Sequence, residues 1–376
     1  MQRVVVLGAG FAGLELATRL SEAVPDEAHV VLIDQAPWFM FGFSKLDVLF
    51  GRKRPDDVKL HYDRLAKPGV EFRCERITAI DPERRRVVTD ADTYDADVLV
   101  VALGADLDPA ATPGLEAAGY EFYTPSGAER LRDALPSFDS GAVVISVLGG
   151  FFKCPPAPYE TALMLHDYLA RRGVRDRASI TLFTPLSMPI PISTETSSAI
   201  VGALDERDIE FCPESLVSHL DPRAKVAHLR DGRSIGFDLF MAIPIHRAPP
   251  VVEESGLTED GWIPVDPATF ATRFPGVYAV GDVTSAPVPR AGVIAEGEAA
   301  VVADTIIAAI RSGEPPPPYQ GKAVCYIEFG GDEVAKVDVN FLSGAQPTAV
   351  YHPPSVDLAG EKAHFGSSRR ARWFGY

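Results

Sequence analysis

Basic residues, cysteines and long apolar runs are all scarce in this sequence. Its 36 Lys and Arg residues face 52 Asp and Glu residues, which gives a formal net charge of -16. That balance argues against nucleic acid as a partner, because phosphate binding needs a basic surface. No apolar run approaches the roughly 18 to 20 residues that span a bilayer. The first predicted strand begins at residue 3, which leaves no room for a signal peptide, so we expect a cytoplasmic protein.

The chain has only four cysteines, Cys74, Cys154, Cys212 and Cys325. In a reducing compartment they are not expected to form a structural disulfide framework, and a pair that does form is expected to be redox-active. Cys74 and Cys212 fall in strand-like pieces, where we expect them to be buried packing residues. We expect no metal site.

The N-terminus carries a dinucleotide-binding pattern. A strand at residues 3–6 is followed by three glycines and a helical pattern through Leu20, and a second strand at 29–33 ends at Asp34. This GxGxxG fingerprint in a βαβ setting lets the backbone approach a pyrophosphate at a helix N-terminus. Asp34 would accept hydrogen bonds from the ribose hydroxyls. The cofactor contacts expected here are Gly8, Gly10, Phe11, Ala12, Gly13, Asp34 and Gln35.

Later strands predict an interrupted first domain. A strand at 98–102 runs into Leu103 and Gly104, and a strand near 276–280 delivers Gly281 and Asp282. Between them, strands at 141–148, 179–183 and 237–245 form a separate α/β unit. The 376 residues, 46% of them hydrophobic, suffice for two or three globular domains. We predict an α/β fold with two Rossmann-like domains: a first domain at 1–109 and 249–314, a middle domain at 110–248, and a small C-terminal segment at 315–376 that starts with four prolines.

The middle domain begins like a second dinucleotide fold and then departs from it. Residues 149–158 read GGFFKCPPAP, so the third glycine is missing. Phe151 and Phe152 obstruct close backbone approach, and the three prolines remove amide donors and resist an immediate helix start. We therefore expect this domain to keep the fold without binding a pyridine nucleotide in the usual way.

These motifs resemble the flavoprotein disulfide reductase superfamily over nearly the whole chain. The resemblance implies FAD, with the first fingerprint holding the ADP half and Asp282 at the ribityl chain and the flavin-side phosphate. The stretch Lys153–Glu160 is similar to that of sulfide:quinone oxidoreductases and the flavoprotein subunit of flavocytochrome c sulfide dehydrogenase. Further cofactor contacts are expected from Ala102, Gly104, Gly281, Arg290, Ala291 and Gly292, with Arg290 standing where these families usually have lysine.

The same resemblance implies a redox pair. Family members carry a redox cysteine at the position of Cys154 and a second one at that of Cys325. The likeness implies that Cys325 faces the flavin while Cys154 carries the incoming sulfur. Glu160 either accepts a proton from hydrogen sulfide or satisfies a helix N-terminus. His246 is expected to be structural, and Lys153 alone is typical of a solvated surface.

Several departures from the family pattern matter. Residues 120–128 lack the third cysteine of the quinone reductases, and residues 37–49 lack a cysteine for a thioether, so we predict a non-covalent FAD. The final stretch 369–376 mixes arginines with aromatics. It could contact a membrane surface, remain a solvated tail or form a dimer contact, and Tyr326 with the tail aromatics could line a quinone pocket.

The function that this sequence predicts is an FAD-dependent sulfide:quinone oxidoreductase. Sulfide is oxidised to sulfane or polysulfide at Cys154 and Cys325, and two electrons pass through FAD to a quinone. One alternative is a type II NADH dehydrogenase or ferredoxin-reductase-like flavoprotein without a redox disulfide. Another is a flavoprotein subunit that passes electrons to a heme partner. Peripheral membrane contact on the cytoplasmic face and a homo-oligomer are both compatible with the sequence.

Overall fold

A computed structural model describes residues 1–376. The first domain is built on a parallel five-stranded sheet of order β20-β9-β1-β2-β5, with helices α1 and α8 packed against each other beside it. Apolar side chains fill both faces of the sheet, because its strands are continuous hydrophobic runs. The sheet strands and the two helices are β1 Gln2–Leu7, β2 Ala28–Asp34, β5 Val70–Cys74, β9 Val98–Val101, β20 Val277–Ala279, α1 Phe11–Ala23 and α8 Gly292–Ile310.

Smaller elements decorate the first domain. A pair of short antiparallel strands with a helix between them and an antiparallel three-stranded sheet lie between β2 and β9 in the chain. One short helix opens the return segment. They are β3 Trp38–Phe39, α2 Ser44–Leu49, β4 Leu60–His61, β6 Ile77–Asp81, β7 Arg86–Thr89, β8 Thr93–Asp95 and α7 Pro250–Glu254.

The middle domain repeats the plan with a second parallel five-stranded sheet, of order β11-β18-β12-β13-β14. The prediction of an α/β fold with two Rossmann-like domains is therefore confirmed. Its sheet strands and helices are β11 Tyr120–Glu121, β12 Gly141–Val147, β13 Ala178–Phe183, β14 Ile209–Cys212, β18 Leu239–Ile243, α3 Leu115–Ala118, α4 Pro125–Ala134, α5 Ala157–Arg171 and α6 Thr194–Asp205. An antiparallel flap comprises β15 Val217–Asp221, β16 Val226–Leu229 and β17 Ser234–Gly236.

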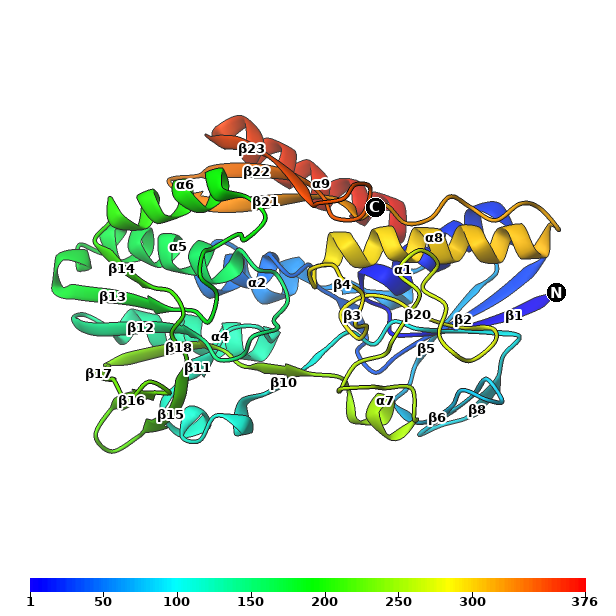
Figure 1. Cartoon of the computed structure of the whole chain (residues 1–376), viewed down its shortest axis with the longest axis horizontal. Coiled ribbons are helices and arrows are strands. Elements are labelled where there is room, and N and C mark those ends of the chain that lie inside the picture. The colour runs from blue at the N-terminus through cyan, green and yellow to red at the C-terminus, as the bar shows by residue number, and fades with distance from the viewer.

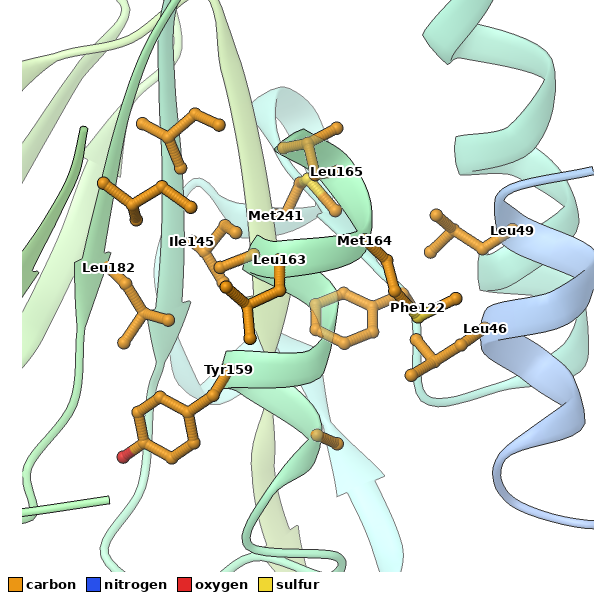
Figure 2. Packing of buried hydrophobic residues seen from close by; sticks show 14 of the residues in the cluster. Leu46, Leu49, Phe122, Ile145, Tyr159, Leu163, Met164, Leu165, Leu182 and Met241 are labelled. Atoms are coloured by element: carbon orange, nitrogen blue, oxygen red, sulfur yellow. The ribbon is translucent and has the colours of Figure 1, made fainter. Parts of the chain in front are cut away.

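The two domains are joined by a pair of antiparallel strands and by a helix that crosses over. Strands β10 Asp106–Asp108 and β19 Ile245–Arg247 pair where the chain enters and leaves the middle domain (Figure 1). Helix α2 comes from the first domain in sequence, yet its apolar side packs into the middle-domain core. Figure 2 shows Leu46 and Leu49 of α2 pointing toward Phe122 and Met164.

The C-terminal segment forms a lid of its own over both domains (Figure 1). Strands β21 Lys322–Gly330, β22 Glu333–Asn340 and β23 Thr348–Ser355 make an antiparallel sheet, followed by helix α9 Val356–Phe374. Ile327 and Phe329 of β21 are buried in the middle-domain core, whereas Trp373 of α9 is buried in that of the first domain. None of the helices is both long and apolar enough to cross a membrane.

Of the three alternatives for the final stretch, the solvated tail is wrong. Trp373 is 0% exposed, and its indole N–H donates to Glu15 of α1 over 3.0 Å. Arg372 pairs with Glu15 and Glu22, while Arg369 pairs with Glu296 of α8. These arginines and aromatics therefore attach α9 to α1 and α8, whose acidic residues pair with the arginines.

The two remaining cysteines also differ from expectation. Cys74 is exposed and Cys212 is half-buried. Each ends an edge strand, β5 or β14, where only one side is covered by a neighbouring strand. Neither is a fully buried packing residue.

Packing at the end of α9 should contribute strongly to stability. We expect Trp373→Ala to lower the free energy of unfolding by about 3–5 kcal/mol, because it empties a fully buried site. Tyr376→Ala, at the neighbouring exposed terminus, should change it by about 0.5 kcal/mol or less. Urea unfolding followed by tryptophan fluorescence or circular dichroism measures both. Equal effects of the two substitutions would contradict the buried position of Trp373.

Candidate active site

One cavity of about 770 Å³ runs between the two domains and the C-terminal segment. Gly8, Gly10 and Asp34 line one part of it, while Cys154 and Cys325 line another. The carboxyl edge of the first sheet, the start of α5 and strand β21 therefore all contribute to the same space. Such a crevice at the carboxyl ends of parallel strands is the usual ligand site of open α/β sheets.

The glycine turn leaves room for a ligand. A Cβ added at Gly8, whose φ is +97°, would lie 2.4 Å from the Ala102 carbonyl oxygen, and one at Gly13 would lie 1.9 Å from that of Gly8. These two glycines permit close helix–strand packing. A Cβ at Gly10 would meet nothing within 4 Å, and Gly10 lines the cavity. The first turn of α1 has no acidic side chain and no side-chain cap, which leaves its N-terminus open to an anion.

Asp34 is held rigidly at the end of β2. Its carboxylate accepts the backbone N–H groups of Ala9 and Ala36, each over 2.8 Å. Burial raises its pKa, and these two hydrogen bonds oppose the shift. The predicted contacts Phe11, Ala12, Gln35, Ala102 and Gly104 line the cavity beside it.

The late motif lines the same cavity, with one exception. Gly281, Asp282, Ala291 and Gly292 face it, and burial raises the pKa of Asp282 against the opposing charges of nearby basic residues. The Arg290 side chain does not line it. Its guanidinium donates to the carbonyls of Asp282 and Thr284 and lies over the Trp262 ring at 3.8 Å. Arg290 thus supports the loop and, contrary to expectation, makes no side-chain contact with the cavity.

Cys154 is fixed in an unusual backbone conformation. Its φ is +58°, a left-handed value that costs of order 1–3 kcal/mol in a residue with a side chain. Its N–H donates to the Arg290 carbonyl over 2.8 Å, and the Tyr123 hydroxyl donates to the Lys153 carbonyl over 2.9 Å. Two other segments of the chain therefore hold the thiol in place.

The start of α5 offers no amide donors to a phosphate. The Ala157 N–H donates to the Cys154 carbonyl, and the N–H groups of Tyr159 and Glu160 both donate to the Pro156 carbonyl. Pro158, in the same turn, has no N–H. The helix N-terminal amides that bind a pyrophosphate in a dinucleotide fold are therefore absent or already used at the start of α5. This supports the expectation that the middle domain does not bind a pyridine nucleotide in the usual way.

Cys154 and Cys325 face the same part of the cavity as free thiols. Burial raises the pKa of Cys154 well above its ordinary value, and the charges of Glu160 and Cys325 add to this. Burial also raises the pKa of Cys325 to about 12, again with a contribution from Glu160. The two cysteines lie 171 positions apart in the sequence. In the structure they are close enough for the charge of one thiolate to affect the pKa of the other.

Glu160 connects the two cysteine segments. It is 3% exposed, sits in the first turn of α5, and accepts the backbone N–H of Glu328 in β21 over 3.0 Å. Its carboxylate therefore bonds across to the strand that carries Cys325 and does not cap its own helix. Burial raises its pKa. Lys362 of α9 lies 3.9 Å from Glu160 and 2.7 Å from the Glu328 carboxylate.

Two further lysines line the cavity. Lys45 of α2 donates to the Tyr123 carbonyl over 2.6 Å, and burial, reinforced by the charge of Lys153, lowers its pKa to about 8. Lys153 donates to the Ala105 carbonyl over 2.9 Å, so it is not the solvated surface lysine that its sequence setting indicates. Sequence reasoning missed Lys45 and Lys362, whose positions follow from how α2 and α9 dock.

The surroundings of His246 are those of a residue that supports the fold. It is buried, its Nδ1 lies 2.9 Å from the Pro244 carbonyl, and its Nε2 accepts the Lys153 N–H. Burial lowers its pKa to about 3, so the ring is neutral near pH 7.

The charge of Glu160 should be visible in the reactivity of the thiols. We expect Glu160→Gln to move the alkylation midpoints of Cys154 and Cys325 to lower pH by about one unit, because a nearby carboxylate disfavours both thiolates. Iodoacetamide labelling of the reduced protein across pH, read by mass spectrometry of each peptide, measures this. Glu195→Gln, at an exposed acid of α6, is the matched control. Unchanged or higher midpoints in Glu160→Gln would show that its carboxylate does not act on the thiols.

Comparisons with known proteins bear on the family of this chain. It is 27% identical over 359 residues to the sulfide-quinone reductase of Aquifex aeolicus, covering 88% of this chain and 82% of that protein. It is 28% identical over 301 residues to an NADH dehydrogenase-like protein of Mycobacterium tuberculosis, covering 76% and 74%. The crystal structure of the A. aeolicus sulfide:quinone oxidoreductase superposes with a TM-score of 0.88 at 23% identity, covering 100% of this chain and 92% of that one.

These similarities confirm the resemblance to sulfide:quinone oxidoreductases that the sequence indicates, and the superposition confirms the fold. The family described as pyridine nucleotide-disulphide oxidoreductase matches residues 2–313, which include all strands of both parallel sheets. On this match the chain belongs to the pyridine nucleotide-disulphide oxidoreductases, a family of flavin-dependent enzymes that use FAD.

Proposed function

We propose that this protein is an FAD-dependent sulfide:quinone oxidoreductase. The observation that carries the proposal is the meeting of Cys154, Cys325 and Glu160 in the cavity that also contains the dinucleotide turn. A buried carboxylate between two cysteines and beside a cofactor cavity suits two-electron sulfur chemistry better than hydride transfer. The start of α5, with no free amide donors, also disfavours NADH as the electron donor.

The residues present fit FAD. Gly8, Gly10 and the N-terminus of α1 would hold its pyrophosphate, Asp34 its ribose, and Asp282 its ribityl chain. The open space at Gly10 and the uncapped helix N-terminus suit a phosphate. The cofactor would supply a two-electron acceptor that returns the cysteine pair to its oxidised form. The only cysteines that line the cavity are Cys154 and Cys325, so the flavin would be held non-covalently.

The reaction begins with the cysteines joined as a disulfide. Glu160, whose pKa burial raises, accepts a proton from hydrogen sulfide and leaves hydrosulfide. Hydrosulfide attacks one sulfur, which forms a new S–S bond, breaks the disulfide and leaves a persulfide on Cys154 and a thiolate on Cys325. The charge of Lys362 favours the Cys325 thiolate. A further sulfur would be added only after the persulfide and the thiolate had passed two electrons to bound FAD, and this oxidation would rejoin the two cysteines through the added sulfur. Attack by another hydrosulfide would then lengthen the chain or release it as sulfane or polysulfide.

Quinone would dock at the aromatic part of the cavity. Phe43, Tyr326 and Phe365 line it, and the Tyr326 and Phe365 ring centroids lie 5.9 Å apart. Flat aromatic side chains can pack against a flat ring. The tail aromatics Trp373, Phe374 and Tyr376 do not line the cavity, so only Tyr326 of the predicted quinone contacts remains in place. Because quinones are lipid-soluble, this function expects peripheral contact with a membrane.

Anaerobic sulfide addition to the holoenzyme tests the proposal. We expect sulfide to bleach the visible flavin absorbance, and Cys154→Ser or Cys325→Ser to slow this by about three orders of magnitude, because both sulfurs share one bond. Cys212→Ser, outside the cavity, should bleach like the wild type. The proposal fails if excess sulfide leaves the flavin oxidised while NADH reduces it rapidly, which would identify an NADH dehydrogenase instead.

A further inference from the structure

A buried acid outside the cavity holds the turn that presents Asp282. Glu298 of α8 is 1% exposed, and its carboxylate accepts the backbone N–H of Gly281. Glu298 is not among the residues that line the main cavity, and it lies behind Gly281 and Asp282, which do line it. The sulfur chemistry proposed above makes no use of it.

The turn itself is tightly held. Gly281 has a φ of +79°, and a Cβ added to it would lie 3.2 Å from the Ala295 side chain of α8. The Gly281 carbonyl accepts the N–H and hydroxyl of Thr284, and the Asp282 carbonyl accepts from Arg290. Glu298 is the partner of the Gly281 amide, and loss of a buried partner would leave that donor unpaired.

The charge on Glu298 is unfavourable where it lies. Burial raises its pKa to about 8, the Gly281 amide opposes this shift, and the Asp282 carboxylate adds to it. Asp282 is the only side chain whose charge raises the pKa of Glu298. Tyr319, from the linker before β21, also faces Glu298, and the first turn of α1 on the neighbouring helix has no acidic side chain. Near pH 7 the carboxyl group is therefore largely protonated.

A bound cofactor would disfavour the ionised form further. A dinucleotide brings a negatively charged diphosphate and displaces water from the cavity beside Asp282, and both effects penalise a second buried negative charge. Cofactor binding thus favours the protonated carboxyl group, and affinity falls as pH rises through about 8.

We propose that Glu298 is a positioning residue that holds the Gly281–Asp282 turn against the cofactor cavity and makes cofactor retention depend on its protonation. The inference rests on the FAD site proposed above, and it adds a regulatory property to that site. It does not depend on whether sulfide is the electron donor.

Flavin release from the holoenzyme tests it. Holoenzyme is diluted at a series of pH values from about 7 to about 9.5, and released FAD is measured by its fluorescence. The proteins compared are the wild type, Glu298→Gln, Glu298→Leu and the control Asp304→Asn, at a half-buried acid of the same helix that pairs with Arg19 and does not line the cavity. Glutamine is isosteric with glutamate and keeps an oxygen for the Gly281 amide, but it cannot ionise.

We expect the FAD dissociation constant of the wild type and of Asp304→Asn to rise about tenfold over this range, as a one-unit pKa difference between free and bound forms requires. In Glu298→Gln the rise should be smaller, because Glu298 no longer ionises and only Lys45, a cavity-lining group whose pKa burial lowers to about 8, still titrates in this range. Glu298→Leu should bind FAD about tenfold more weakly than Glu298→Gln near pH 7, because the Gly281 amide loses its partner.

Equal pH dependence in the wild type and Glu298→Gln would overturn the protonation effect, and equal affinity of Glu298→Gln and Glu298→Leu would overturn the positioning role. If Glu298→Leu does not fold, the pH profile of Glu298→Gln still decides the first point. Sulfide bleaching is measured separately, so failure here is distinguishable from failure of the proposed function.

Discussion

The site depends on one hydrogen bond across domains, from the Glu328 amide to the Glu160 carboxylate. Helix α5 belongs to the middle domain and strand β21 to the C-terminal segment. Cys154 lies just before α5 and Cys325 lies in β21, so each cysteine is only a few residues from this bond. A buried carboxylate bonded to a backbone amide fixes both distance and direction, because the amide cannot move without its strand. Lys362 and Arg52 surround Glu328 and balance the buried negative charge. Removing one charge from such a buried cluster destabilises the fold more than replacing all of its members by apolar residues, because the remaining charges lose their partners.

The three parts of the fold supply different functions. The first sheet carries the dinucleotide turn, with Asp34 and Asp282 at its carboxyl edge. After strand β12 of the middle sheet, Cys154, in a left-handed backbone conformation, stands where a dinucleotide fold has its phosphate-binding loop. The C-terminal segment supplies the second cysteine, the aromatic wall and Lys362. Neither Rossmann-like domain alone contains a complete site, which explains why the cavity lies between all three.

Most of the fold could be predicted from the sequence, because buried parallel strands are continuous apolar runs and the first glycine fingerprint has a fixed geometry. The meeting of Cys154 and Cys325 followed from family resemblance and not from spacing. Lys45 and Lys362 could not be found, since each is a single lysine on a helix whose docking is set by distant apolar contacts. Arg290 and the final arginines were misjudged for a related reason. Arg290 donates to a backbone carbonyl, and the final arginines pair with acids on α1 and α8. None of these partners can be recognised from the residues next to the arginines in sequence.

Helix α9 has a consequence for synthesis of the protein. The ribosome makes the dinucleotide turn long before residues 356–374, yet those later residues provide Lys362 and Phe365 in the cavity and Trp373 behind Phe11 of the turn. Domains fold as they emerge, from the N-terminus onward. The cavity therefore lacks a wall until residues 356–374 have been made, and a nascent chain that has not yet reached them leaves Cys154 without that wall.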